Sequence, residues 1–143
     1  MFRLLPMVLM IVLFSSSSAF ALNSCQDGDF ADMRGEAVVR IANDDPTNPF
    51  RYRPRCVIVS EATRVEFRAL PNFGMHPLYG GTVTGSMATF DPASPIGPFT
   101  SGTQGDSMLM SSGEFPFFCD FHFTSGMMGS IRVVPELFAE GFD

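Results

Sequence analysis

The sequence predicts an all-β protein, an antiparallel Greek-key β-sandwich of about seven or eight short strands. Two observations support this fold class. The chain of 143 residues contains 13 glycines and 11 prolines, which divide it into short apolar stretches separated by turn clusters. Several of these stretches alternate polar and apolar residues, as strands with one buried face do. The length suits one domain with one sizeable core.

The expected strands are β-branched or alternating runs that lie between turns. They cover residues 36–41, 56–59, 63–68, a weak stretch around Val83, 107–111, 114–119 and 130–134. Within residues 63–68, Val65 and Phe67 alternate with polar neighbours and should face the core. Residues 91–105 are rich in Pro, Gly, Ser and Thr, so we expect a long surface loop there. Residues 135–143 are expected to form an amphipathic tail.

Residues 1–21 have the three parts of a secretory signal peptide. Arg3 supplies the positive start, residues 4–14 form an apolar region, and Ala19 and Ala21 form a small-residue cleavage pattern. The apolar region is short for a bilayer span, so a cleaved signal is preferred to a retained anchor. We therefore expect residues 22–143 to form a single exported domain, periplasmic or secreted, without a membrane span.

The charge pattern argues against a nucleic-acid partner. The formal net charge is −6 and the chain has no lysine, whereas nucleic-acid binding requires a basic face. The one basic cluster consists of Arg51, Arg53 and Arg55. We interpret it as a solvated strand edge in preference to a partner site.

The three cysteines are Cys25, Cys56 and Cys119, an odd number for an exported protein. If Cys119 binds a metal, Cys25 and Cys56 remain to form one disulfide in an oxidising compartment. That bridge would close a loop of about thirty residues and stabilise the fold by about 3–4 kcal/mol. The alternative is lipid attachment at Cys25, which would leave Cys56 unpaired and which Asn23 fits poorly.

The residues best suited to chemistry lie in the segment 115–133, between two expected strands. Cys119, His122 and Met127 have the spacing C-x2-H-x4-M. Their thiolate, imidazole and thioether groups are soft or borderline ligands, which suit copper better than magnesium or calcium. His76 is the only other histidine in the chain, so it alone could supply a second imidazole.

This segment resembles the ligand loop of the plastocyanin-like cupredoxins. Gly126 and Gly129 frame the methionine as in that family, and His76 lies where the family places its upstream histidine, before a central strand. The specific motifs cover residues 73–81 and 115–133. The resemblance implies an eight-stranded sandwich that holds one mononuclear type 1 (blue) copper ion.

The same resemblance implies the ligand set. His76 Nδ1, Cys119 Sγ and His122 Nδ1 would be the equatorial ligands, and Met127 Sδ would be a long axial ligand. Met128 competes with Met127 for the axial position, but the spacing favours Met127.

One departure from the family pattern concerns Pro77. The residue after the upstream histidine is often an asparagine, whose backbone N–H donates a hydrogen bond to the cysteine sulfur. Pro77 has no N–H, and the resulting loss of one donor would make the thiolate more electron-rich. We therefore expect a lower copper potential.

The flanking residues argue against an enzyme. Multicopper oxidases need a histidine on each side of the cysteine, whereas Phe118 and Asp120 flank Cys119. A binuclear copper site would need a second cysteine in this loop. With both histidines bound to the metal, none remains for a Ser/His/Asp or Cys/His catalytic arrangement.

The sequence thus predicts a monomeric, exported type 1 copper protein that carries single electrons between transient redox partner proteins by cycling between Cu(I) and Cu(II). A periplasmic copper-binding or copper-handling protein without an electron-transfer role is the first alternative. The second is a structural β-sandwich in which the Cys/His/Met cluster is coincidental. Strong visible absorption and rapid electron exchange would distinguish the first hypothesis from both.

Overall fold

The structure is a computed structural model in which residues 21–136 are described. The predicted signal peptide falls almost entirely on residues 1–20 and most of the predicted tail on residues 137–143, so both lie outside the described residues. Three short 3-10 turns occur between residues 21 and 136: η1 (Leu22–Ser24), η2 (Asp27–Asp29) and η3 (Phe123–Ser125). No helix in this range is long and apolar enough to cross a membrane.

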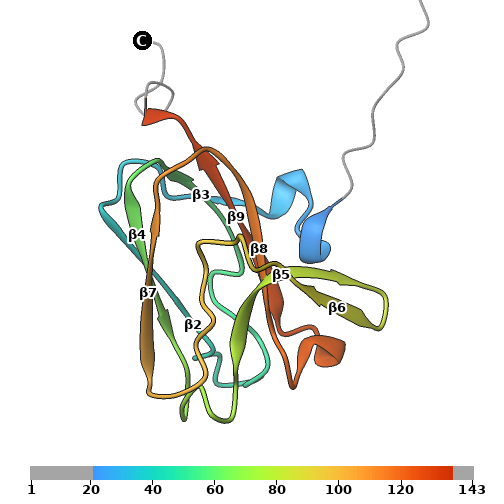
Figure 1. The fold of residues 1–143 in the computed structure, drawn as a ribbon. Coiled ribbons are helices and arrows are strands. Elements are labelled where there is room, and N and C mark those ends of the chain that lie inside the picture. Colours follow the sequence, from blue (N-terminus) through green and yellow to red (C-terminus); the bar gives the residue numbers. More distant parts are fainter. Residues whose placement is uncertain (1–20, 137–143) are drawn as a thin grey trace, which may run out of the picture.

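Two sheets pack face to face in the described chain (Figure 1). The larger sheet has the strand order β1-β3-β9-β8-β5-β6, and the smaller one has the order β2-β4-β7. The strands are β1 (Ala31–Asp32), β2 (Val38–Ala42), β3 (Cys56–Ser60), β4 (Thr63–Arg68), β5 (Leu78–Thr84), β6 (Met87–Phe90), β7 (Gln104–Leu109), β8 (Gly113–Cys119) and β9 (Met128–Val134). The predicted β-sandwich is confirmed.

Strand direction is mixed in both sheets. The β1–β3, β3–β9 and β2–β4 ladders are parallel, whereas the β4–β7, β5–β6, β5–β8 and β8–β9 ladders are antiparallel. Parallel neighbours require a crossover connection, because a tight hairpin can join only antiparallel strands. The sandwich therefore contains parallel pairs in addition to the antiparallel ones that were expected.

The core lies between the two sheets and follows from strand alternation. Val65 and Phe67 on β4 are fully buried, as predicted. The Phe67 ring contacts the Phe117 ring of β8 edge-on, with the ring centroids 5.2 Å apart. Phe118 is also buried, but it points to the other face of the sheet, where its ring stacks with Tyr79. The strand that leads to Cys119 is thus packed on both faces.

The region around Val83 was predicted only weakly and forms the β5–β6 hairpin, which projects to the side in Figure 1. Two consecutive glycines in β5 remove the side chains that would reveal an alternating pattern. The predicted loop 91–105 packs along β5. Leu78 and Phe99 exchange two backbone hydrogen bonds of 2.9 Å, and Ile96 is fully buried. The segment is therefore anchored along much of its length.

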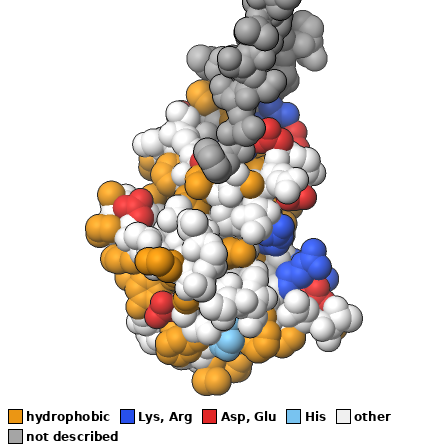
Figure 2. Space-filling view, turned by 90° about the vertical axis from the view of Figure 1, so that its right-hand side faces the viewer, with side chains coloured by type: hydrophobic (Ala, Val, Ile, Leu, Met, Phe, Trp, Pro, Cys, Tyr) orange, Lys and Arg blue, Asp and Glu red, His pale blue; other side chains and the backbone are white. Residues whose placement is uncertain are grey.

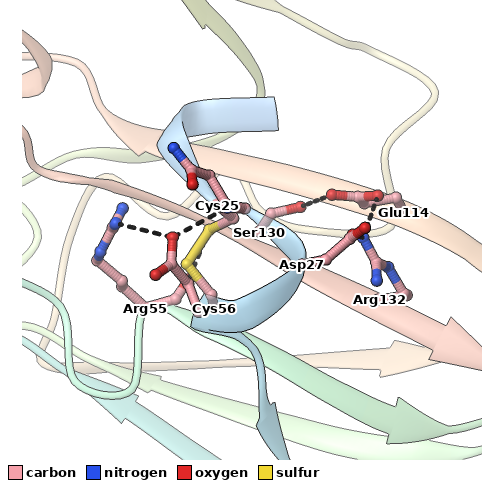
Figure 3. Close-up of polar contacts among 9 residues, drawn as sticks. Cys25, Asp27, Arg55, Cys56, Glu114, Ser130 and Arg132 are labelled. Atoms are coloured by element: carbon pink, nitrogen blue, oxygen red, sulfur yellow. Dashed lines mark hydrogen bonds and ion pairs between the residues drawn. A yellow bond between two sulfur atoms is a disulfide. The ribbon is translucent and has the colours of Figure 1, made fainter. Parts of the chain in front are cut away.

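An N-terminal hook, residues 22–30, packs against the larger sheet. The predicted Cys25–Cys56 disulfide is present and ties the hook to the start of β3 (Figure 3). Arg55 donates hydrogen bonds to the carbonyls of Asn23 (3.4 Å) and Ser24 (3.0 Å). Arg132 on β9 pairs with Asp27 in the hook at 3.0 Å.

Asn23 is the buried anchor of this hook, with 2% of its surface exposed. Its Nδ2 donates to the carbonyls of Gly81 (3.1 Å), Phe117 (2.8 Å) and Gly129 (3.1 Å). Its Oδ1 accepts a hydrogen bond from the Val83 N–H at 2.8 Å. One side chain thereby links β5, β8 and β9, the strands that lead into and out of the predicted ligand loops.

Candidate metal centre

Three of the four predicted ligand residues, His76, Cys119 and His122, meet at one end of the sandwich. There β8 ends and β5 begins, at the lower end of the view in Figure 1. Cys119 is the last residue of β8, and His122 follows it immediately before η3. His76 precedes β5, and the β5–β8 ladder places Leu78 opposite Cys119. Strand pairing therefore brings together residues that are more than forty positions apart in the sequence.

The three donor atoms lie at distances that fit a shared metal ion. His76 Nδ1 and His122 Nδ1 are 3.1 Å apart, and Cys119 Sγ lies 3.9 Å from the first and 3.6 Å from the second. Metal–nitrogen bonds of about 2.0 Å and a metal–sulfur bond of about 2.3 Å, in a trigonal arrangement, place the nitrogens about 3.5 Å apart and each nitrogen about 3.7 Å from the sulfur. The observed triangle is close to that geometry.

A tight loop holds Cys119 and His122 in this position. The His122 N–H donates to the Cys119 carbonyl (3.2 Å), and the Cys119 N–H donates to the Met127 carbonyl (2.9 Å). Gly126 ends η3 in the left-handed conformation with φ 86°, which favours glycine. Gly129 follows at a close approach, where a Cβ atom would collide with the Arg55 carbonyl and the Phe117 ring. These contacts explain both glycines of the motif.

The two methionines of this loop occupy different environments. Met127 is fully buried and belongs to the same hydrophobic cluster as Cys119. Met128 is half-buried and is the first residue of β9.

Burial shifts the pKa values of His76 and Cys119 in opposite directions. Burial, followed by the neighbouring His122, lowers the pKa of His76, which keeps a lone pair free on its imidazole. Burial also raises the pKa of the Cys119 thiol. Hydrogen bonds from the backbone N–H groups of Phe121 and His122 oppose that rise, whereas the charge of Asp120 adds to it. A metal cation that replaced the thiol proton would offset the cost of burying the thiolate.

Pro77 contributes to the site through its carbonyl. The Asp120 N–H donates a hydrogen bond of 2.9 Å to the Pro77 oxygen, which ties the Cys119 loop to the His76 loop. Pro77 lacks an N–H and therefore donates no backbone hydrogen bond to the Cys119 sulfur. The sequence pattern revealed the missing donor but gave no indication of this carbonyl link.

An apolar rim surrounds the site. Phe121 and Met75, the chain neighbours of His122 and His76, have 61% and 56% of their surfaces exposed. Figure 2 shows histidine atoms at the lower surface with hydrophobic side chains around them. His122 is half-buried, whereas His76 and Cys119 are buried. Of the three donor residues, His122 is thus the one that reaches the surface.

One residue at this site was not recognised in the sequence. The Phe50 ring stacks on the His122 imidazole, with the centroids 4.4 Å apart and the planes inclined by 22°. The alternation F-R-Y-R over residues 50–53 indicates that Phe50 and Tyr52 point inward from an extended stretch. This alternation alone does not reveal which part of the protein the two side chains contact.

Comparisons with known proteins support the fold. No protein-family model matches the sequence, and no curated protein matches it. The structure is similar to that of the copper protein rusticyanin, with a TM-score of 0.55, 18% identity and coverage of 79% of this chain and 88% of rusticyanin. Plastocyanin from Dryopteris crassirhizoma gives a TM-score of 0.45 at 14% identity, with 67% of this chain and all of that chain covered.

A third similar structure is the copper-containing nitrite reductase of Thermus scotoductus, with a TM-score of 0.44 and 19% identity over 67% of this chain and 22% of that enzyme. Fold similarity at such identities says nothing about activity. The similarity to rusticyanin shows that the two packed sheets form a known architecture. The chain has the cupredoxin fold, with a His-Cys-His cluster that fits a type 1 copper site.

Proposed function

We propose that this protein is a type 1 copper protein that carries single electrons between redox partners. In this proposal His76 Nδ1, Cys119 Sγ and His122 Nδ1 hold one copper ion, and Met127 supplies a weak axial ligand. The observation that carries the proposal is the donor triangle, whose sides of 3.1, 3.6 and 3.9 Å match a trigonal site. Two imidazoles, one thiolate and a weak axial thioether form the ligand set of blue-copper electron-transfer sites.

The placement of the methionines supports Met127 as the axial ligand. Met127 and Cys119 share one buried cluster, and the backbone hydrogen bond between them fixes the ends of the loop. Met128 begins a strand in which successive side chains point to opposite faces. A ligand must face the donor triangle, and the burial of Met127 fits that requirement better.

Bound copper would supply a one-electron Cu(I)/Cu(II) couple. The residues of the chain would hold its ligands in a fixed geometry and exclude water from the thiolate. Cys119 is fully buried at the end of a strand packed on both faces, and its backbone N–H is bonded to the Met127 carbonyl. A frame that holds the ligands in place in both oxidation states favours fast electron transfer, because little of it has to rearrange.

Electrons would leave through His122, the donor residue nearest the surface. The exposed apolar side chains of Phe121 and Met75, next to His122 and His76 in the chain, give a small surface on which a partner can dock transiently. This supports a carrier that meets partner redox proteins briefly. Because no further histidine exists in the chain, the proposal includes no second copper centre and no catalytic activity.

Voltammetry of the copper-loaded protein tests the proposal. An electron carrier gives a reversible one-electron wave with fast exchange, and the wave persists over repeated cycles. Slow exchange with loss of copper during cycling would instead support a copper-binding or copper-handling protein. Cys119→Ala is the matched control, since it removes the thiolate and should abolish the wave.

A further inference from the structure

The segment 43–55 reaches the metal centre from a part of the chain that contains none of the proposed ligands. It connects β2 with β3 and places Phe50 over the His122 ring at 4.4 Å. The same Phe50 ring lies edge-on to His76, with the centroids 6.1 Å apart and the planes inclined by 63°. Phe50 therefore contacts both imidazoles of the donor triangle and is stacked on the more exposed one.

Phe50 is held in this position from both sides. On its N-terminal side, the buried Asn43 side chain donates to the Pro49 carbonyl (3.1 Å) and the Leu70 carbonyl (2.8 Å). The Leu70 N–H donates back to Asn43 Oδ1 at 2.8 Å. Asn43 thus joins the Phe50 segment to the connection that leads to His76.

On its C-terminal side, Tyr52 is buried in the core, where its ring contacts the Phe117 ring edge-on at 5.2 Å. Arg53 and Ala42 exchange backbone hydrogen bonds of 2.7 and 3.1 Å. The Phe50 N–H itself donates to Asn48 Oδ1 at 3.0 Å. With both flanks fixed, the Phe50 ring has little freedom to leave the imidazole.

We propose that Phe50 is a positioning residue of the metal centre, which fixes the His122 imidazole in the orientation that turns Nδ1 toward His76 and Cys119 and covers one face of that ring. His122 otherwise lies on a short loop at the surface, where its ring could rotate. Residues that fix the orientation of a ligand ring influence how tightly the site holds its metal. This inference rests on the proposed copper function.

The test uses Phe50→Leu, which keeps an apolar side chain of similar reach but removes the aromatic ring. Phe50→Tyr is the conservative variant and retains the stack. Phe90→Leu is the matched control, because Phe90 is a partly exposed phenylalanine on β6 whose described ring contact is with Tyr79. Thermal unfolding confirms that each variant is folded.

Two readouts are measured. In the metal-free protein, NMR of the His122 ring should show one orientation in wild type and Phe50→Tyr, and ring signals displaced and broadened by exchange in Phe50→Leu. In the Cu(I)-loaded protein, transfer of copper to an excess of a Cu(I) chelator should be about 2- to 10-fold faster in Phe50→Leu, the range expected for one lost aromatic stack. Phe90→Leu should behave as wild type in both.

Phe50→Leu with the ring signals and release rate of Phe90→Leu would overturn the inference. A failure of wild-type protein to take up copper would overturn the proposed function instead. The His122 signals of the metal-free protein would then still decide whether Phe50 orients that ring, so the two failures are distinguishable.

Discussion

The N-terminal hook and the metal centre both pack against the larger sheet, but they use their polar groups in opposite ways. In the hook, Asn23 is buried and makes four hydrogen bonds to backbone groups of the sheet, and Cys25 is bonded to Cys56. At the metal centre, the donor atoms of His76, Cys119 and His122 turn toward one another. The hook stabilises the frame, and the metal centre uses that frame to hold donor atoms ready for a cation.

The three cysteines show the same difference between the two regions. Cys25 and Cys56 stabilise by restricting the unfolded chain, whereas Cys119 is the free and buried cysteine of the described residues. Substitutions in the two regions should therefore affect different properties of the protein. Substitutions in the hook should lower the free energy of unfolding and leave the copper spectrum unchanged. Substitutions at the metal centre should change the copper spectrum and leave the fold intact.

The largest expected effect is that of Cys119→Ser. Without the thiolate, the copper-loaded variant should lose its intense visible absorption and its reversible redox wave completely. Because serine is close to cysteine in size, the fold should persist, as circular dichroism can check. Retention of the intense absorption in this variant would show that the sulfur is not a copper ligand.

Removal of the disulfide should give the largest loss of stability. The double variant Cys25→Ala/Cys56→Ala opens a loop with a sequence separation of 31. A chain-entropy estimate gives a loss of about 3–4 kcal/mol in the free energy of unfolding, measurable by urea denaturation. The visible spectrum of the copper-loaded variant should be that of wild type. A changed spectrum with unchanged stability would reverse the roles assigned to the two regions.

Asn23→Ala should have the next largest effect on stability. It leaves one backbone N–H and three carbonyls of β5, β8 and β9 without their side-chain partner. Because unsatisfied buried polar groups are costly, we expect a loss of about 2–4 kcal/mol in the free energy of unfolding. Ser24→Ala, a neighbouring change outside this network, serves as the control. Equal stabilities for the two variants would contradict the anchoring role of Asn23.

The smallest effect is expected for Pro77→Asn. An N–H at this position would add a donor to the Cys119 sulfur and favour the reduced, more electron-rich state. A hydrogen bond of about 1 kcal/mol corresponds to a rise of about 40 mV in a one-electron potential. Voltammetry of the two proteins measures the difference. An unchanged or lower potential in the variant would refute the hypothesis.

The sequence revealed much of the fold because strand alternation is local. Residues 63–68 form β4 with the predicted bounds, and Val65 and Phe67 face the core. The β5–β6 hairpin was largely missed because its glycines carry no pattern. Parallel pairing, such as β3 with β9, joins residues more than seventy positions apart, and no local periodicity encodes it.

The metal centre was predictable where chemistry depends on residue type and spacing. Cys119 and His122 lie three positions apart on one loop, and the scarcity of histidine in the chain leaves His76 as the second imidazole. Phe50 was not predictable, since its contact with His122 depends on how the β2–β3 connection folds back over the sheet. The link from Pro77 to Asp120 likewise depends on tertiary structure.

Titration of the purified, metal-free protein with Cu(II), followed by visible absorption, tests the central claim most directly. The proposed site predicts an intense blue colour from the Cys119 thiolate that rises linearly and stops at one equivalent of copper. A weak absorption without a sharp end point, or copper uptake without colour, would contradict a thiolate-bound mononuclear copper site.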